Sequence, residues 1–146
     1  MVTIEWRDSD GNELFNETYE NIIVNTWLSS VANLLGWINV DSPFDYLANG
    51  SDSTVAGATQ TALISENTIN WFERTQVTPT RITTTVANDT LQLENTFTAT
   101  GTITVNEIWI LNAVTTGVLL SRLVLPVTKS FSSGDTMKIT YKIILA

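Results

Sequence analysis

The sequence lacks two residue types that carry much of enzyme and metal chemistry, since it contains no histidine and no cysteine. The commonest general base and the usual zinc ligands are therefore missing. Carboxylates remain, and a pair of them could act as the acid and base of a glycosidase. The candidates for such a pair are Glu66, Glu73, Glu94 and Glu107. Solvation explains most carboxylates in so acidic a chain, and we predict no catalytic residue, no metal site and no cofactor.

The segment DSDGNE, residues 8–13, has the oxygen-rich composition of a calcium loop. In an EF-hand loop the glycine stands at the sixth position, whereas Gly11 is the fourth residue of this segment. Asp10-Gly11 is also a typical turn between two strands. A turn accounts for the segment without a metal, so we predict a hairpin here.

One acid and one base stand in the most apolar part of the chain, Glu107 in TITVNEIWILN and Arg122 in GVLLSRLVL. These segments predict a hairpin around the loop 113–116, with Gly117 supplying the backbone freedom of a tight turn. If Asn112 faces Gly117, Glu107 lies directly opposite Arg122, on the same face of the sheet. We predict an ion pair that fixes register and assists assembly. Two separately solvated charges, or a catalytic acid at Glu107, are the alternatives.

Hydrophobic periodicity predicts one helix, over residues 18–36. Ile23, Trp27, Val31 and Leu34 recur at helical spacing, and we expect them to pack the helix on the sandwich or over one of its ends.

The predicted helix has a natural stop at Gly36, and Trp37 could fold back on its last turn. The only other helical structure that we expect is a possible single turn near Thr61–Glu66.

The remainder of the chain is predicted to form strands separated by turns. Residues 1–20 predict an N-terminal hairpin or arm, and residues 44–146 a series of strands. The last strand is the clearest, because apolar residues from Met137 to Leu145 alternate with threonine and lysine. The fold class is mainly β: one domain, an antiparallel, jelly-roll-like β-sandwich with one N-terminal helix.

The net charge of −8 is unevenly distributed. Up to Glu66 the chain carries ten acidic residues and a single base, Arg7. This surface repels phosphate, so we expect no direct nucleic-acid contact. A basic protein, divalent cations or simple solvation would suit it. No segment has the length of a membrane span, and the first residues lack signal-peptide character, so we expect synthesis in the cytoplasm.

Five blocks occur in an order that resembles small virion proteins of tailed bacteriophages and tailed archaeal viruses. The blocks are NIIVNTWLSSVANLLG, FDYLANGSDST, TALISE, TITVNEIWILNAVTTGVLLSR and SSGDTMKITYKIIL. The acid in NEIWILNA and the base in LLSR strengthen the likeness. LANG in place of an ALGTG-like turn, NEIWIL in place of TEAGLF, and the first twenty residues depart from the pattern.

The resemblance implies a non-enzymatic structural part of a virus particle, foremost a capsid decoration (cement) protein bound to the major capsid protein or other virion proteins. A tail or head-fibre domain is the runner-up. A carbohydrate-binding module using exposed tryptophans is an alternative of another class. The low charged content of 15%, the five tryptophans and the apolar residues on both faces of later strands further predict a homo-oligomer, with a trimer favoured.

Overall fold

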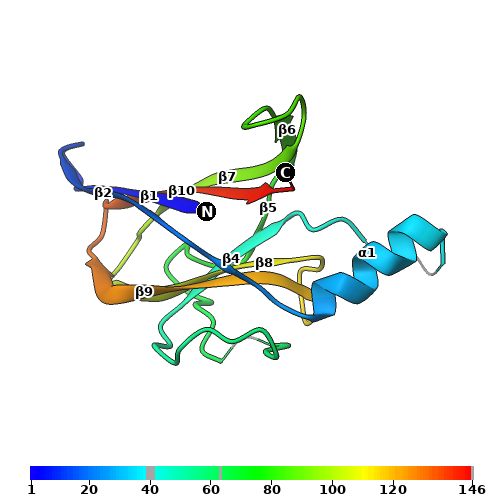
Figure 1. Ribbon diagram of the computed structural model, residues 1–146. Coiled ribbons are helices and arrows are strands. Elements are labelled where there is room, and N and C mark those ends of the chain that lie inside the picture. Colours follow the sequence, from blue (N-terminus) through cyan, green and yellow to red (C-terminus); the bar gives the residue numbers. More distant parts are fainter. Residues whose placement is uncertain (39–41, 63, 146) are drawn as a thin grey trace.

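Two five-stranded antiparallel sheets are stacked face to face, with one helix at an end of the stack (Figure 1). The structure is a computed structural model and describes residues 1–38, 42–62 and 64–145. In these residues the elements are β1 (Val2–Arg7), β2 (Glu13–Tyr19), β3 (Ile22–Ile23), α1 (Thr26–Gly36), β4 (Tyr46–Gly50), β5 (Thr75–Gln76), β6 (Thr80–Ile82), β7 (Thr90–Thr98), β8 (Ile103–Leu111), β9 (Leu119–Phe131) and β10 (Thr136–Ile144). The predicted mainly-β antiparallel sandwich with one helix is confirmed.

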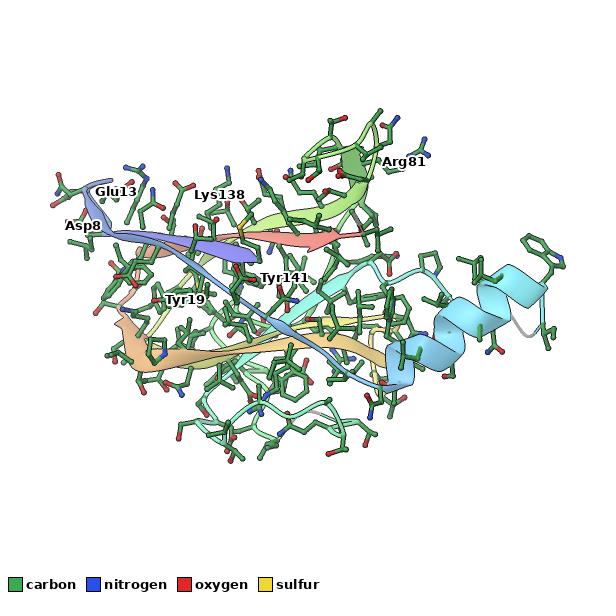
Figure 2. The ribbon with its side chains drawn as sticks, viewed as in Figure 1. Asp8, Glu13, Tyr19, Arg81, Lys138 and Tyr141 are labelled. Carbon is green, nitrogen blue, oxygen red and sulfur yellow. The ribbon has the colours of Figure 1, made fainter. Side chains whose placement is uncertain are left out.

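Sheet 1 has the strand order β2-β1-β10-β7-β6. Its central strand, β10, shows the predicted alternation: Met137, Ile139 and Tyr141 are completely buried in the core. Figure 2 shows Tyr141 pointing between the sheets and Lys138 pointing away from them. Because successive residues of a strand face opposite sides, this alternation places one face of sheet 1 in the core and the other in solvent.

Sheet 2 has the order β3-β9-β8-β4-β5, and its central strand is covered on both faces. On one side Ile108 and Ile110 join the core between the sheets. On the other side Trp109 and Leu111 form a separate buried cluster. The apolar residues on both faces of β8 are therefore buried on both sides of sheet 2.

A buried polar chain joins the two sheets. The Tyr141 hydroxyl of β10 donates to Ser121 Oγ of β9 over 2.8 Å. Ser121 Oγ also accepts from Asn21 Nδ2 and donates to the carbonyl of Ile22. A buried hydroxyl with all its partners costs little, so this chain sets how the sheets and the segment before α1 lie against each other.

The predicted N-terminal hairpin is confirmed. The helix, in contrast, begins later in the chain than predicted. Residues 18 and 19 end β2, and β3 pairs with β9 in the register Ile22↔Arg122 and Ile23↔Ser121. Within the predicted range 18–36, the helical part is Thr26–Gly36. The apolar run Ile22–Val24 suits a strand as well as a helix, and the open edge of β9 supplies backbone partners that decide between them.

Two further expectations fail in the middle of the chain. Within the series of strands predicted over residues 44–146, the segment TINWFERTQV, residues 68–77, forms only β5, because Asn70 and Trp71 take positive φ values of 59° and 62°, which break an extended chain. The helical turn near Thr61–Glu66 is absent from residues 61, 62 and 64–66, while residue 63 lies outside the described part.

Candidate functional site

The predicted hairpin of β8 and β9 forms, with a register different from the predicted one. Glu107 faces Val124, and Trp109 faces Arg122, because Asn112 pairs with Val118 instead of Gly117 and the pairing shifts again between Ile110 and Leu111. Direct opposition of Glu107 and Arg122 was therefore wrong. The error is two residues along a strand, and a two-residue step keeps a side chain on the same face.

Glu107 and Arg122 nevertheless make the predicted ion pair, as diagonal neighbours. Arg122 Nη2 lies 2.7 Å and Nε 2.9 Å from Glu107 Oε2. Both side chains are 0% exposed. The Arg122 guanidinium also lies 4.8 Å from the ring centre of Trp109, a cation–π distance. The pair sits on the outer face of sheet 2, away from the core between the sheets.

A long irregular segment covers this outer face, and we call it the strap: residues 51–62 and 64–74. It runs as a cyan-to-green coil on the outer side of sheet 2 in Figure 1. Arg122 holds its first part, because Nη1 donates to Gln60 Oε1 over 2.9 Å and Nη2 to Asp52 Oδ1 over 3.2 Å. One guanidinium thus joins β8 and β9 to two points of the strap.

A second arginine holds the other end of the strap. Arg74 makes a two-pronged pair with Glu66, with both N···O distances 2.8 Å. Its Nη1 also donates to the carbonyls of Ala113 and Thr116 in the β8–β9 turn. Bidentate arginine–carboxylate pairs combine strength with fixed geometry. The strap is therefore held by two arginine clamps, centred on Arg122 and Arg74.

The end of β4 leaves no room beside the ion pair. A Cβ added to Gly50 would lie 2.3 Å from the Ser65 carbonyl oxygen and 2.5 Å from Glu107 Oε1. Only a residue without a side chain lets the strap and Glu107 approach this closely.

Burial and hydrogen bonding move the carboxyl groups of this region in opposite directions. Burial raises the pKa of Glu107, although the Arg122 guanidinium opposes the shift. Hydrogen bonds from Thr54 lower the pKa of Asp52, and Arg122 adds to the lowering. The buried acid and the strap acid therefore respond to pH with opposite signs.

Three of the four carboxylates considered for catalysis form ion pairs with basic side chains. Glu107 is 0% exposed, so it cannot touch a substrate without displacement of the strap. Of the other candidate carboxylates, Glu66 is engaged by Arg74 and Glu94 by Lys138. The described part of the chain holds no group of acidic side chains able to bind a metal ion.

The predicted turn at residues 8–13 is an Asp-stabilised loop. One Asp8 carboxylate oxygen accepts hydrogen bonds from the Asp10 and Asn12 amides, and the other accepts from Asn12 Nδ2. Gly11 has a φ of 86°. These internal hydrogen bonds account for the oxygen-rich composition of the turn.

The residues predicted to pack the helix are divided between two environments. Ile23 lies in β3 instead of the helix, and both Ile23 and Trp27 pack partly buried against the core. Val31 is half-buried, and Leu34 is 54% exposed. The N-terminal end of α1 is tied to sheet 2, where Thr26 Oγ1 donates to the Leu119 carbonyl over 2.7 Å.

The C-terminal half of α1 extends away from both sheets (Figure 1). Its apolar side chains are largely in solvent: Leu35 is 83% and Trp37 82% exposed. The expectation that Trp37 folds back was wrong. Trp37 takes a left-handed φ of 55°. The helix ends there with a hydrogen bond that the amide of Ile38 donates to the carbonyl of Asn33. We call the exposed apolar side chains of α1 and of the residues directly after it the helix knob: Leu28, Leu34, Leu35, Trp37 and Ile38.

Beside the helix knob lies an apolar groove of about 270 Å³. The groove runs between α1 and the chain that leads to β4. Its lining consists of Trp27, Ser30, Val31, Leu34, Ser42, Pro43 and Phe44.

Sequence reasoning missed most of the strap. The sequence patterns singled out none of Asp52, Gln60 and Arg74 as residues with a structural role. No local pattern distinguishes these residues, because their partners lie far away in sequence: Arg122 is 70 residues from Asp52 and 62 from Gln60. The break in the strand at Trp71 had one local signal, Asn70, since asparagine is depleted in strands and takes positive φ more readily than most residues.

No helix of the described residues is both long and apolar enough to cross a bilayer. No family model, no curated protein and no solved structure matches this chain.

Proposed function

We propose that this protein is a non-enzymatic virion structural protein, made in the host cytoplasm and bound to the viral head as a decoration, or cement, protein. Its partners in this role are the major capsid protein or other virion proteins, and the protein acts as a homo-oligomer, with a trimer favoured. A tail or head-fibre domain is the variant of the same role.

The observation that carries an assembly role is the helix knob on a rigid sandwich. Exposed apolar groups that lie together mark interaction surfaces in soluble proteins. The knob stands at the end of a scaffold whose longest irregular segment is fixed by two arginine clamps. A rigid body with an apolar contact surface suits repeated binding on a symmetric particle, where many weak contacts add.

The resemblance to small virion proteins directs the assembly role to a virus particle. Its two charged landmarks, the acid of NEIWILNA and the base of LLSR, are Glu107 and Arg122. Their contact under the strap gives these landmarks a structural reason. This supports a shared architecture and assigns no chemistry to either residue.

A carbohydrate-binding module is favoured by a different observation, the exposure of Trp37 and Trp71 at 82% and 71%. Indole rings in solvent can stack on sugars. In that role the isolated protein binds a glycan, and a Trp71→Ala variant loses the binding while Leu35→Ser keeps it. A glycan array with both variants tests this directly.

The virion proposal is tested on particles of the virus that encodes the chain. Purified particles should contain the protein by mass spectrometry, and recombinant protein should sediment with particles stripped of it. Gold-labelled antibody should mark heads for a decoration protein and tails or fibres for the variant role. Absence of the protein from gradient-purified particles would overturn the proposal.

A further inference from the structure

We propose that the helix knob and its neighbouring groove bind another copy of this same chain. The inference deepens the proposed assembly role by naming the occupant of its apolar surface. It can fail separately, because a protein can belong to a virion and still be monomeric.

Charge is the first argument for a second copy. The stretch 21–40 contains no charged residue, although the whole chain carries −8. Two copies of so acidic a protein repel each other over most approaches. An uncharged surface is where they can meet without bringing like charges together. A basic partner would find only Asp41 and Asp45 beside the groove residues 42–44 in the sequence, and would be drawn to the more acidic surfaces instead.

Shape is the second argument, because the chain carries both halves of a contact. Leu35 and Trp37 project from α1, and the groove between α1 and Phe44 is apolar and open. Both are built on the same helix, so one copy's projecting side chains can enter the groove of the next. Aromatic side chains that fill such grooves are typical binding anchors.

The amount of exposed apolar surface is the third argument. The exposed fractions of the five knob residues are 59% for Leu28, 54% for Leu34, 83% for Leu35, 82% for Trp37 and 60% for Ile38. Together they equal more than three fully exposed large side chains, or on the order of 500–850 Å² if each offered the 150–250 Å² of an aromatic side chain. That is at the upper end of the largest patch on a monomer and close to one side of a standard interface.

Leu35 and Trp37 of the knob lie outside the lining of the groove, so a one-way contact in which they enter the groove of the next copy is heterologous. Such contacts close into rings when the rotation between copies permits, and a three-fold ring is the smallest that is not a dimer. A reciprocal two-fold contact can also satisfy both patches. The measured mass therefore separates the trimer from the dimer, and either one supports self-association through α1.

The test compares two double variants of the full chain by analytical ultracentrifugation. L35S/W37S changes the knob, and V114S/V127S changes two valines, each 62% exposed, that lie outside it. Wild type and V114S/V127S should form the same oligomer at micromolar concentration. L35S/W37S should raise the dissociation constant at least about tenfold, as loss of a central anchor does. Circular dichroism should show the same β spectrum in all three proteins.

Added salt supplies an independent readout. If uncharged surfaces join while the rest of the chain repels, 0.5 M NaCl should strengthen association by screening the repulsion. A wild-type protein that stays monomeric at high micromolar concentration in both low and high salt overturns the inference. So does an oligomer whose mass is unchanged in L35S/W37S, since its contact would then lie elsewhere. Detection of the protein in particles decides the proposed function separately.

Discussion

The strap side of sheet 2 and the end of α1 reverse the usual distribution of side chains. Under the strap, Arg122 and Glu107 are 0% exposed. On α1, Leu35 and Trp37 are more than four-fifths exposed. Charged groups are seldom fully buried unless they are paired, and groups of large apolar side chains exposed to solvent usually mark an interaction surface. The contrast separates a region that holds the fold in place from one that is available to a partner.

The strap needs charged clamps because it has few apolar groups to bury. Residues 51–62 are mostly small and polar, so hydrophobic burial cannot fix their position on the sheet. Directional hydrogen bonds from Arg122 and Arg74 can fix the position of the strap on the sheet. Burying a pair of charges adds little net stability, whereas breaking the pair is costly. The clamps therefore specify where the strap lies.

The largest effect should come from Arg122→Met. This change leaves Glu107 buried beside Asp52 without its cation, and removal of one partner of a buried pair typically costs about 3–5 kcal/mol. Urea unfolding at pH 7 measures the loss. Arg81→Met is the matched control, because Arg81 projects from β6 into solvent (Figure 2), and its effect should stay within about 0.5 kcal/mol.

Glu107→Gln should cost less than Arg122→Met, since Gln retains an oxygen acceptor and Asp52 still balances Arg122. The double variant should be more stable than the sum of the two single losses predicts, as expected for groups in contact. Simple additivity would show that the two residues act independently and would contradict the clamp.

The second largest effect should come from Gly50→Ala, which tests how closely the strap is held. The new Cβ would overlap the Ser65 carbonyl and Glu107 Oε1, so strap and ion pair must move apart. We expect a loss of about 1–3 kcal/mol or more from overpacking. Gly57→Ala, with nothing within 4 Å of its new Cβ, is the control and should be near neutral. Equal melting temperatures for the two variants would mean that the strap is loose.

A smaller effect should distinguish the two ends of α1. Trp27 packs against the core while remaining partly exposed, so Trp27→Ala should cost less than the about 3–5 kcal/mol of a fully buried aromatic. Leu35→Ser should leave the unfolding free energy of the dissociated protein nearly unchanged, because Leu35 is 83% exposed. Differential scanning calorimetry on dilute samples measures both. If Leu35→Ser lost stability and Trp27→Ala did not, the C-terminal end of α1 would be the end that stabilises the fold, and the assignment made here would be wrong.

Local patterns predicted the parts of this fold that depend on neighbours in sequence. The alternation around Ile139 and Tyr141 identified β10, and the turn residues identified the hairpins. The Glu107–Arg122 contact was predictable because strand periodicity preserves its face. The register was not predictable, because shifts near Asn106 and Leu111 change the pairing within β8 and β9. The strap clamps and the exposed end of α1 depend on contacts, made or missing, between distant segments, which periodicity does not encode.

The smallest effect concerns pH and compares two buried carboxyl groups. Asp89 accepts hydrogen bonds from the amides of Thr84, Thr85 and Val86, which lower its pKa, with Val86 the largest cause. A lowered pKa gives stability that is present above the unfolded value near 3.8 and is lost as pH falls through the folded value. Burial raises the pKa of Glu107, which has the opposite sign. Its contribution is fully present below the unfolded value near 4.5 and is lost as pH rises through the folded value.

Wild-type stability should therefore fall on both sides of a mildly acidic optimum, for a different reason on each side. Asp89→Asn should flatten the acid side, because its side chain no longer takes up a proton on unfolding. Glu107→Gln should flatten the side above the optimum and leave the acid side unchanged. Urea midpoints measured from pH 2 to pH 8 separate the two. If Glu107→Gln instead flattened the acid side, the Arg122 guanidinium would outweigh burial at Glu107, and the clamp would stabilise the fold as well as position the strap.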